Sequence, residues 1–428
     1  MQIDALYKVY TQFPHIQTDS RKLRAGELFF ALKGPNFNGN QFAEAALKAG
    51  AAAVIVDEET GLQSDKIWRC TDVLQTLQEL ALFHRRQFSI PFIAITGSNG
   101  KTTSKELVHA VLSRKFRTCT TQGNLNNHIG IPLTILSVKP DAEIAVIEMG
   151  ANHQKEIAAY CTYTEPTHGI ITNCGKAHLE GFGGIEGVRK GKGELYDFLR
   201  SNGGTIFRMN DYDYLLEMSR GINNTVTYGT REAQITGQAI DGELLQVQFT
   251  GGTALNTLQT QLVGNYNLPN VLLAVAVGVH FGVPETDIQQ AIESYTPSNS
   301  RSQLVIRGTN KIILDAYNAN PTSMRAAIEN MAGLPDSNKV LMIGGMMEMG
   351  AASHDEHKAI IQLIGQYSWN DVVLVGGDFG AIPHNYHFFP DSAAAAYWLR
   401  SHPMEHCTFL IKGSRSMRME QVLDAFPA

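Results

Sequence analysis

The sequence has few cysteines, no long apolar run and no excess of basic residues. Its five cysteines are dispersed without CxxC spacing, which argues against a disulfide framework or a zinc knuckle and favours reduced thiols. No apolar run approaches the roughly 18 residues that a bilayer-spanning helix needs. The formal net charge of −6 gives no electrostatic argument for a nucleic-acid or anionic-membrane partner.

The first residues, 1–13, also lack the basic-then-apolar pattern of a secretory signal. We therefore expect a cytoplasmic protein with no nucleic-acid partner and no membrane insertion, and we expect it to be a monomer. Hydrophobic residues make up 43% and charged residues 18% of the chain, as in globular proteins with a large core. A length of 428 residues exceeds that of a usual single domain and indicates about three domains.

The chain is organised around a strand, a glycine loop and a helix. Residues 92–95 are a short apolar run typical of a buried strand, and apolar residues at helical spacing follow from residue 107 to 112. The loop between them reads Thr96, Gly97, Ser98, Asn99, Gly100, Lys101, Thr102 and Thr103. Glycines permit a tight turn, and the free N–H groups at the following helix start attract phosphate.

In such a loop Lys101 would reach the outer phosphates and the Thr102 hydroxyl would bind magnesium. The spacing, GxxGKT, is two residues shorter than the common GxxxxGK[ST] pattern. An ordinary glycine turn before Lys-Thr is the alternative, but the flanking strand and helix are the context that supports the motif. The sequence therefore indicates a nucleoside triphosphate site, with ATP and Mg²⁺ as the expected ligands.

Further polar side chains follow apolar strands in the same segment. Glu148 ends the apolar run 142–147, where a carboxylate could hold magnesium opposite Thr102 or only cap the strand. His178 follows the run 169–172, and the residues alone leave a metal ligand and a structural hydrogen-bonder equally open. By pattern alone, the basic stretch that contains Lys192 reads as the solvated start of a helix.

The rest of the chain alternates strands and helices. Before the glycine loop we expect strands at 28–32 and 51–56 and helices at 42–49 and 72–86; residues 222–262 alternate as a small β region. In the last segment we expect strands at 312–314, 340–343, 372–375 and 409–411, and helices at 323–331, 354–366, 393–400 and 417–426. Such alternation predicts a mostly parallel sheet covered on both faces.

Together these motifs resemble the Mur ligases, the ATP-dependent amide ligases of peptidoglycan precursor synthesis, over nearly the whole chain. The matching stretches are 96–102, 148–150, 175–180 and 192–194. Residues 123–132, 317–324 (YNANPTSM) and 412–417 are similar to the branch of the family that adds D-alanyl-D-alanine. The DNPR motif of the branch that adds the third stem residue is absent, and so is the NKxD motif of GTPase switches.

The resemblance implies an α/β fold of three domains: a small α/β UDP-sugar-binding domain over 1–84, a P-loop ATP-binding domain with a mostly parallel sheet over 85–297, and a Rossmann-like ligase domain over 298–428. It implies ATP-dependent joining of D-alanyl-D-alanine to UDP-N-acetylmuramoyl-tripeptide through an acyl phosphate, which gives the pentapeptide precursor of peptidoglycan. Roles in cell wall biogenesis, cell shape, the cell cycle and cell division would follow.

The resemblance also implies site residues. The nucleotide would be bound by the loop 96–103 with Asn270, Arg301 and Asp315. Mg²⁺ would be bound by Thr102, Glu148 and His178. Lys101, His178 and Lys192 would be catalytic, with Lys192 carried as a carbamate. The substrate-binding residues would be Ser20, Arg21, Asn126, Asn127, Asn318, Asn320, Lys412, Ser414 and Arg415.

Three positions depart from the family pattern. Tyr266 stands where the family often has histidine, Gly345 where aspartate is common, and Ala316 where serine is usual; none of the three removes a phosphate- or metal-binding group. The alternatives are another Mur-type amino-acid ligase, a folylpolyglutamate synthase, or a non-catalytic ATP-binding subunit. A non-catalytic subunit would be expected to lack one or more of Lys101, Glu148, His178 and Lys192, and all four are present.

Overall fold

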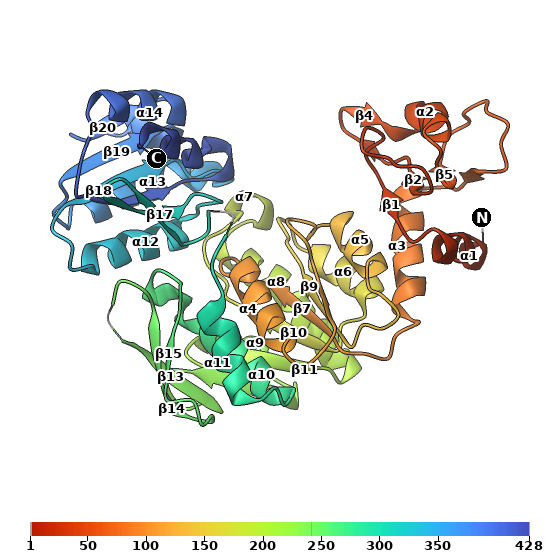
Figure 1. Cartoon of the computed structure of the whole chain (residues 1–428), viewed down its shortest axis with the longest axis horizontal. Coiled ribbons are helices and arrows are strands. Elements are labelled where there is room, and N and C mark those ends of the chain that lie inside the picture. The colour runs from red at the N-terminus through yellow and green to blue at the C-terminus, as the bar shows by residue number, and fades with distance from the viewer. Residues whose placement is uncertain (1, 241, 299, 428) are drawn as a thin grey trace.

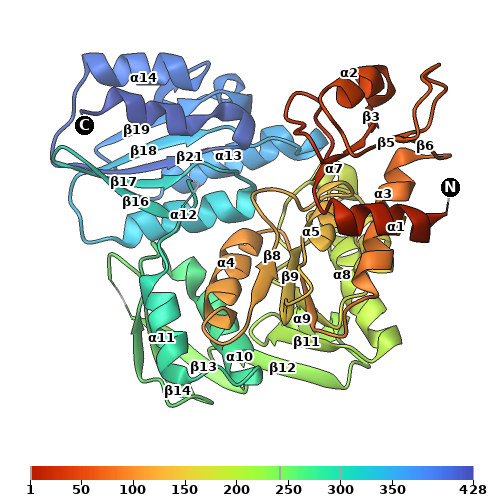
Figure 2. The same cartoon turned by 45° about the vertical axis from the view of Figure 1, so that its right-hand side comes forward.

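The computed structural model describes residues 2–240, 242–298 and 300–427. Within these ranges the strands form a four-stranded, a nine-stranded and a six-stranded sheet, besides a two-stranded hairpin. Figures 1 and 2 show the three sheets as successive bodies along the chain, with the smallest at the N-terminal end. None of the described helices is both long and apolar enough to cross a membrane.

The N-terminal sheet has the order β1–β2–β5–β6 and is parallel throughout. Its strands are β1 (Ile16–Gln17), β2 (Leu28–Phe30), β5 (Ala53–Val56) and β6 (Ile67–Arg69), with the hairpin β3 (Lys33–Gly34) and β4 (Phe37–Asn38) beside it. Because side chains alternate along a strand, Phe29 joins one core with α2 (Ala43–Lys48), while Phe30 joins the core of α1 (Ile3–Gln12) and α3 (Val73–Arg85). The expected helix 42–49 is preceded by a 3₁₀ turn, Gly39–Phe42.

The central sheet has the order β15–β14–β13–β12–β11–β10–β7–β9–β8, and it is parallel from β13 to β8. Its strands are β7 (Phe92–Thr96), β8 (Thr118–Thr120), β9 (Ile144–Glu148), β10 (His168–Ile171), β11 (Thr205–Met209), β12 (Asn224–Gly229), β13 (Ile235–Ile240), β14 (Gln246–Gly251) and β15 (Thr257–Gln259). The last four, β12 to β15, form the β region expected at 222–262.

The helices of this body are α4 (Lys101–Leu112), α5 (Gly130–Leu136), α6 (Glu156–Thr164), α7 (Leu179–Phe182), α8 (Ile185–Asn202), α9 (Asp213–Met218), α10 (Leu268–His280) and α11 (Glu285–Ser294). The chain leaves β7, forms β8 and β9 on one side of it, and returns as β10 on the other. Ligands bind at such a change of direction, beyond the carboxyl ends of the strands, and the glycine loop follows β7 at that point.

The C-terminal sheet has the order β16–β17–β21–β18–β19–β20, and only the β16–β17 pair is antiparallel. Its strands are β16 (Gln303–Arg307), β17 (Asn310–Asp315), β18 (Lys339–Gly344), β19 (Asp371–Val375), β20 (His387–Phe389) and β21 (Thr408–Lys412). Helices α12 (Pro321–Gly333) and α13 (Ser353–Ile364) cover one face, and α14 (Ser392–Ser401) covers the other (Figure 2). The predicted mixed α/β fold with mostly parallel sheets is confirmed.

Two expectations about helices need correction. The sequence pattern predicts that the helix after the glycine loop begins at Thr103, but it begins at Lys101, because the Lys-Thr pair forms its first turn. The helix expected at 417–426 is wrong: the chain forms two 3₁₀ segments, Arg415–Met417 and Met419–Ala425, separated by Arg418 at φ 49. A left-handed residue there ends one helical segment before the next begins.

Arg85, at the end of α3, connects the N-terminal body to the central one. It is buried, and its guanidinium donates to the backbone oxygens of Thr164 at 2.8 Å, Glu165 at 2.9 Å and Phe88 at 2.9 Å. The same group lies 4.0 Å from the centroid of the Phe92 ring. Replacing Arg85 with methionine leaves these carbonyls without a donor, so we expect the free energy of unfolding to fall by about 3 kcal/mol.

The neighbouring Arg86 provides a matched control. It is exposed and pairs with the Glu165 carboxylate at 2.7 Å, so Arg86→Met should change stability by no more than about 0.5 kcal/mol. Denaturant unfolding of both variants makes the comparison. Equal effects of the two substitutions would mean that the buried contacts of Arg85 do not stabilise the fold.

Candidate active site

A cavity of about 820 Å³ lies between the central and C-terminal bodies. The central body lines it with residues 98–103, with loop residues that include Asn126 and Asn127, with Glu148 and His178, and with residues 265–270. The C-terminal body contributes Arg301, Ser302, Asp315, 317–320, 322, 323, 326, 347, Glu348 and Lys412. Residues that are far apart in the sequence therefore enclose one polar space.

The glycine loop has the backbone geometry that the sequence predicts. Gly97 and Gly100 have φ of +146° and +78°, which favour glycine. A Cβ at Gly100 would also lie 2.7 Å from Asn270 Oδ1. Thr96 Oγ1 donates to the Met149 carbonyl at 2.8 Å, which joins β7 to the end of β9. The loop is therefore held between neighbouring strand ends, at the start of α4.

Lys101 turns back over the loop. Its Nζ donates to the carbonyl oxygens of Gly97 at 2.7 Å and Ser98 at 3.3 Å. Burial lowers the pKa of Lys101, the Glu148 carboxylate opposes that shift, and Arg301 adds to it. The next residue, Thr102, is buried, and Thr103 lines the cavity beside it. This end of the cavity thus carries a cation, two hydroxyls and a helix start, all suited to an anion.

Glu148 lies opposite Thr102. Its Oε1 accepts from Thr102 Oγ1 at 3.2 Å and from Asn126 Nδ2 at 2.8 Å. Glu148 as a whole is 1% exposed. Its Oε2 is buried without a hydrogen-bond partner. A buried carboxylate oxygen left free beside a hydroxyl fits a hard cation such as Mg²⁺.

The other acidic and imidazole side chains of the described residues do not form a metal-binding cluster around Glu148. Nowhere in the described ranges do three or more His, Cys, Asp or Glu residues gather as a metal cluster. Mg²⁺ needs no such cluster, because it usually takes one or two protein carboxylates and completes its shell with phosphate oxygens and water. The residues present therefore fit Mg²⁺ better than a metal that requires a full set of protein ligands.

His178 lies on the cavity wall at the start of α7, with φ +51°. Its Nδ1 contacts the carboxylate of Glu348 in the C-terminal body, and this contact lowers the pKa of Glu348. The sequence reasoning missed Glu348. Glu348 lies in the loop after β18 (Lys339–Gly344), whereas Glu148 is the last residue of β9, so the strand-end pattern did not single out Glu348.

Lys192 is not solvated, so the interpretation of its segment as a solvated helix start is wrong at this residue. It is 1% exposed, its Nζ donates to the Ala151 carbonyl at 3.0 Å and lies 4.9 Å from the Phe182 ring centroid. Lys192 shares a helix face with the buried Val188, whereas Lys190 faces solvent. Burial, and secondarily the charge of Lys101, lowers the pKa of Lys192 to about 7.

Asn270 lies beside the glycine loop, where it accepts from Ser104 Oγ at 3.0 Å and donates to Asn267 Oδ1 at 2.9 Å. The Tyr266 hydroxyl lies 3.0 Å from Ser302 Oγ, and burial raises its pKa. Arg301 places its guanidinium 3.5 Å from the Tyr317 ring centroid. Tyr266, at the position where the family often has histidine, thus contacts the C-terminal body through Ser302.

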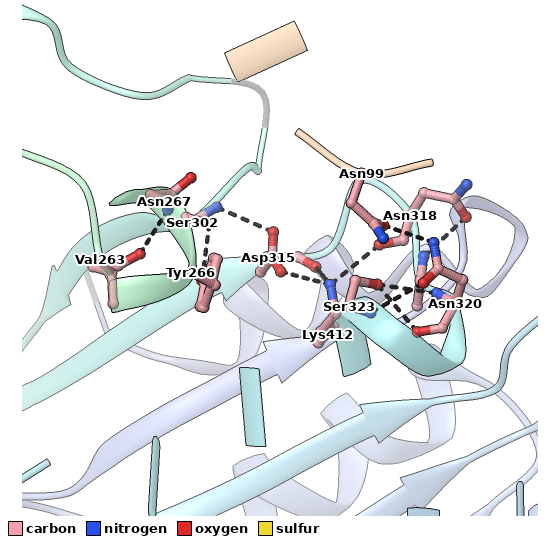
Figure 3. A network of polar contacts seen from close by, with 11 residues as sticks. Asn99, Val263, Tyr266, Asn267, Ser302, Asp315, Asn318, Asn320, Ser323 and Lys412 are labelled. Carbon is pink, nitrogen blue, oxygen red and sulfur yellow. Dashed lines mark hydrogen bonds and ion pairs between the residues drawn. The ribbon is translucent and has the colours of Figure 1, made fainter. Parts of the chain in front are cut away.

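The buried Lys412 pairs with the partly exposed Asp315 in the network of Figure 3. Lys412 Nζ lies 2.5 Å from Asp315 Oδ2 and donates to the Asn318 carbonyl at 3.3 Å. The other oxygen, Asp315 Oδ1, accepts from the Ser302 N–H at 3.1 Å. The pair holds the ends of β17 and β21 together and fixes the start of the loop at 315–320.

Seven of the candidate site residues do not line the cavity. Three of them, Thr96, Gly97 and Lys192, are described above, and the other four lie in other parts of the fold. Ser20 and Arg21 belong to the N-terminal body, where Arg21 donates twice to the Asp19 carboxylate at 2.8 Å. Ser414 is buried and donates to the Gly345 carbonyl at 2.7 Å, and Arg415 pairs with Glu420 at 2.8 Å. The structure does not bring these four residues to the cavity wall.

Comparisons with known proteins cover almost the whole chain. Profiles described as Mur ligase family, catalytic domain, as Mur ligase middle domain, and as Mur ligase, glutamate ligase domain match residues 12–88, 95–278 and 300–415. The UDP-N-acetylmuramoyl-tripeptide–D-alanyl-D-alanine ligase of Bacillus subtilis is 33% identical over 95% of this chain and 92% of its own.

Solved structures agree along the same length. A crystal structure of MurF from Acinetobacter baumannii superposes with a TM-score of 0.88 at 29% identity, over 96% of this chain and 92% of the other. The structure of MurF ligase from Thermotoga maritima in complex with ADP superposes with a TM-score of 0.87 at 26% identity, over 96% of both chains. Since the three profiles follow one another along the sequence and both structures have this three-body arrangement, the chain belongs to the Mur ligase family.

Proposed function

We propose that this chain is an ATP-dependent ligase that joins D-alanyl-D-alanine to UDP-N-acetylmuramoyl-tripeptide in peptidoglycan synthesis. The observation that carries the proposal is the full-length similarity to a ligase of that name, on a chain that keeps Lys101, Glu148, His178 and Lys192. The chain also carries YNANPTSM at 317–324 on the cavity wall. Another amino-acid ligase of the family, or a non-catalytic subunit, has no comparable support.

The first step joins two anions, because the tripeptide carboxylate attacks the γ-phosphorus of ATP and ADP leaves. The Lys101 ammonium lies at the helix start, where it would offset the charge that the phosphoryl oxygens carry. Glu148 and Thr102 would hold Mg²⁺, with His178 at a second such ion. When bound, Mg²⁺ neutralises phosphate charge.

The second step consumes the acyl phosphate. The free amine of D-alanyl-D-alanine attacks the acyl carbon, the nitrogen loses a proton, and inorganic phosphate leaves. Water would compete for the same carbon, so the reaction needs an enclosed site. The C-terminal body supplies one wall of the cavity through Asp315, Asn318 and Lys412.

We assign the remaining contacts by position. The nucleotide would lie along residues 96–103, with Asn270, Arg301 and Asp315 around its nucleoside part. Asn126, Asn127, Asn318 and Lys412 would contact the peptide substrates. Ser20 and Arg21 would bind the UDP-sugar end, and Ser414 and Arg415 would act after movement of the C-terminal body. Residues 1–84, 85–297 and 298–428 stand as the proposed domains.

The cellular setting is part of the same proposal. A ligase of peptidoglycan precursors would act as a monomer in the cytoplasm and would support cell wall biogenesis, cell shape, the cell cycle and cell division.

Phosphate release with ATP, Mg²⁺ and UDP-N-acetylmuramoyl-tripeptide, measured with each candidate amine in turn, tests the proposal. We expect turnover with D-alanyl-D-alanine and a product mass equal to the pentapeptide precursor. Single amino acids should give less than about one hundredth of that rate, because an amine that leaves buried polar groups unpaired is rejected strongly. Turnover with a single amino acid alone would move the enzyme to another step, and no turnover with any amine would favour a binding subunit.

A further inference from the structure

Asn99, in the glycine loop, and Asn320, in the C-terminal body, are joined by one hydrogen bond across the cavity. Asn320 Nδ2 donates to Asn99 Oδ1 at 2.7 Å. Figure 3 shows the two side chains meeting at the end of the network that begins at Tyr266. The Asn99 Nδ2 is buried and has no hydrogen-bond partner, and Asn99 lines the cavity.

The orientation of the Asn320 amide is fixed within its own helix. Asn320 is the N-cap of α12: its Oδ1 accepts from the Ser323 N–H at 3.0 Å, and its own N–H donates to Ser323 Oγ at 3.1 Å. An amide whose oxygen caps a helix must point its NH₂ group elsewhere. In Asn320 that group points at Asn99.

This orientation determines that of Asn99. Because Asn99 Oδ1 accepts from Asn320, the Asn99 NH₂ group must occupy the other position. The Asn99 backbone is held separately: its N–H donates to Asn173 Oδ1 at 3.0 Å and its carbonyl accepts from Thr172 Oγ1 at 2.6 Å. The side chain is thus set by the C-terminal body, although the residue belongs to the glycine loop.

We propose that Asn320 is a positioning residue that turns Asn99 so that Asn99 Nδ2 donates to a phosphoryl oxygen of the bound nucleotide. The donor is buried and unpaired, and it belongs to the glycine loop two residues before Lys101. An anionic oxygen is the acceptor that would satisfy it. The C-terminal body thereby completes the phosphate site of the central body. The inference rests on the proposed ATP-dependent reaction, and it assigns Asn320 a role other than the direct substrate contact expected from the sequence.

Three variants test the inference. Asn99→Ala removes the donor. Asn320→Ser retains an N-cap oxygen but cannot reach Asn99. Asn320→Asp also caps the helix, but its carboxylate only accepts, so Asn99 must turn its NH₂ group towards it and away from the phosphate. We expect each variant to lower kcat by about 10- to 100-fold, the effect of one hydrogen bond to a charged group.

The same variants should weaken binding of AMP-PNP, a non-hydrolysable ATP analogue, by at least about 10-fold, and should leave the KM for D-alanyl-D-alanine unchanged. The double variant Asn99→Ala/Asn320→Ser should be no worse than Asn99→Ala, because Asn320 acts through Asn99. Asp391→Ala is the matched control, since Asp391 is the N-cap of α14 in the same body, accepts from the Ala394 N–H at 2.8 Å and does not line the cavity. It should change the Tm and not kcat.

Three results would overturn the inference. If Asn320→Asp keeps wild-type kcat while Asn99→Ala does not, the bond only holds the two bodies together. If the Asn320 variants raise only the KM for D-alanyl-D-alanine, Asn320 contacts that substrate directly. If the double variant shows the product of the single losses, the residues act independently. Wild-type turnover with a different amine would overturn the proposed substrate alone, because the AMP-PNP comparison remains valid.

Discussion

Replacement of Lys101 by methionine is expected to lower kcat by about 10³-fold or more, the scale on which phosphoryl-transfer enzymes depend on a single cation at the transferring group. Methionine keeps most of the length and the apolar stem but has no charge. The Lys101 ammonium is the cation of the loop that turns over the Gly97 and Ser98 carbonyls. Without it, the negative charge of the γ-phosphoryl group faces the tripeptide carboxylate with less compensation.

Rapid-quench measurement of the first ATP turnover, with hydroxylamine to trap the acyl phosphate, separates this effect from later steps. The rate of acyl-phosphate formation should fall as much as kcat, because Lys101 acts before the amine reacts. Lys115→Met is the control: Lys115 follows α4 and donates to the backbone oxygens of Phe281 and Gly282, away from the cavity. A Lys101 variant that loses only affinity for the tripeptide would contradict the role assigned here.

The strand-end side chains are the part of the cavity that the sequence predicts well. Glu148 follows a recognisable apolar strand, and Lys101 and Thr102 follow a glycine loop between a strand and a helix. In a parallel sheet these local patterns fix the position of a residue, since the carboxyl ends of the strands meet at one edge. The expected grouping of Thr102 with Glu148 therefore needed no knowledge of long-range contacts.

Contacts between the central and C-terminal bodies could not be predicted in this way. The Asn320–Asn99 bond joins residues 221 positions apart, and it depends on which amide atom caps α12. The contact of His178 with Glu348 depends on how the loop after β18 lies against α7. A local pattern predicts the element to which a residue belongs, but it does not predict which side chain of another body will face it.

The burial of Lys192 illustrates the same limit within one body. The sequence around it is basic and glycine-containing, which is typical of an exposed helix start. The residue is nevertheless buried because its face of α8 carries Val188 and Leu195, which belong to the core. Helical spacing alone could have shown that Lys192 shares a face with both, and the charge of its neighbours hid that signal.

Lys192→Arg should reduce kcat by about 10²- to 10³-fold, because arginine keeps a positive charge at every accessible pH and has no neutral amine to form a carbamate. The pKa of Lys192 lies at about 7, far below the ordinary lysine value of about 10.4. In close to half of the molecules the Lys192 amine is therefore neutral at pH 7, and the neutral amine is the form that combines with CO₂. The Ala151 carbonyl, which Nζ contacts at 3.0 Å, can still accept from the N–H that a carbamate retains.

The sign of the pH effect follows from that pKa. Below pH 7 the amine becomes protonated, and its neutral fraction falls to about one tenth at pH 6, so carbamate formation should weaken as the pH falls. In CO₂-depleted buffer we expect kcat to drop more at pH 6 than at pH 8, and added bicarbonate should restore it. A carbamate carbon signal in ¹³C NMR after exposure to ¹³CO₂ should be present in the wild type and absent in Lys192→Arg. Lys190→Arg, on the exposed face of the same helix, should behave as the wild type does. Activity that is independent of CO₂, with no carbamate signal, would instead assign Lys192 a direct role as a buried amine beside Lys101.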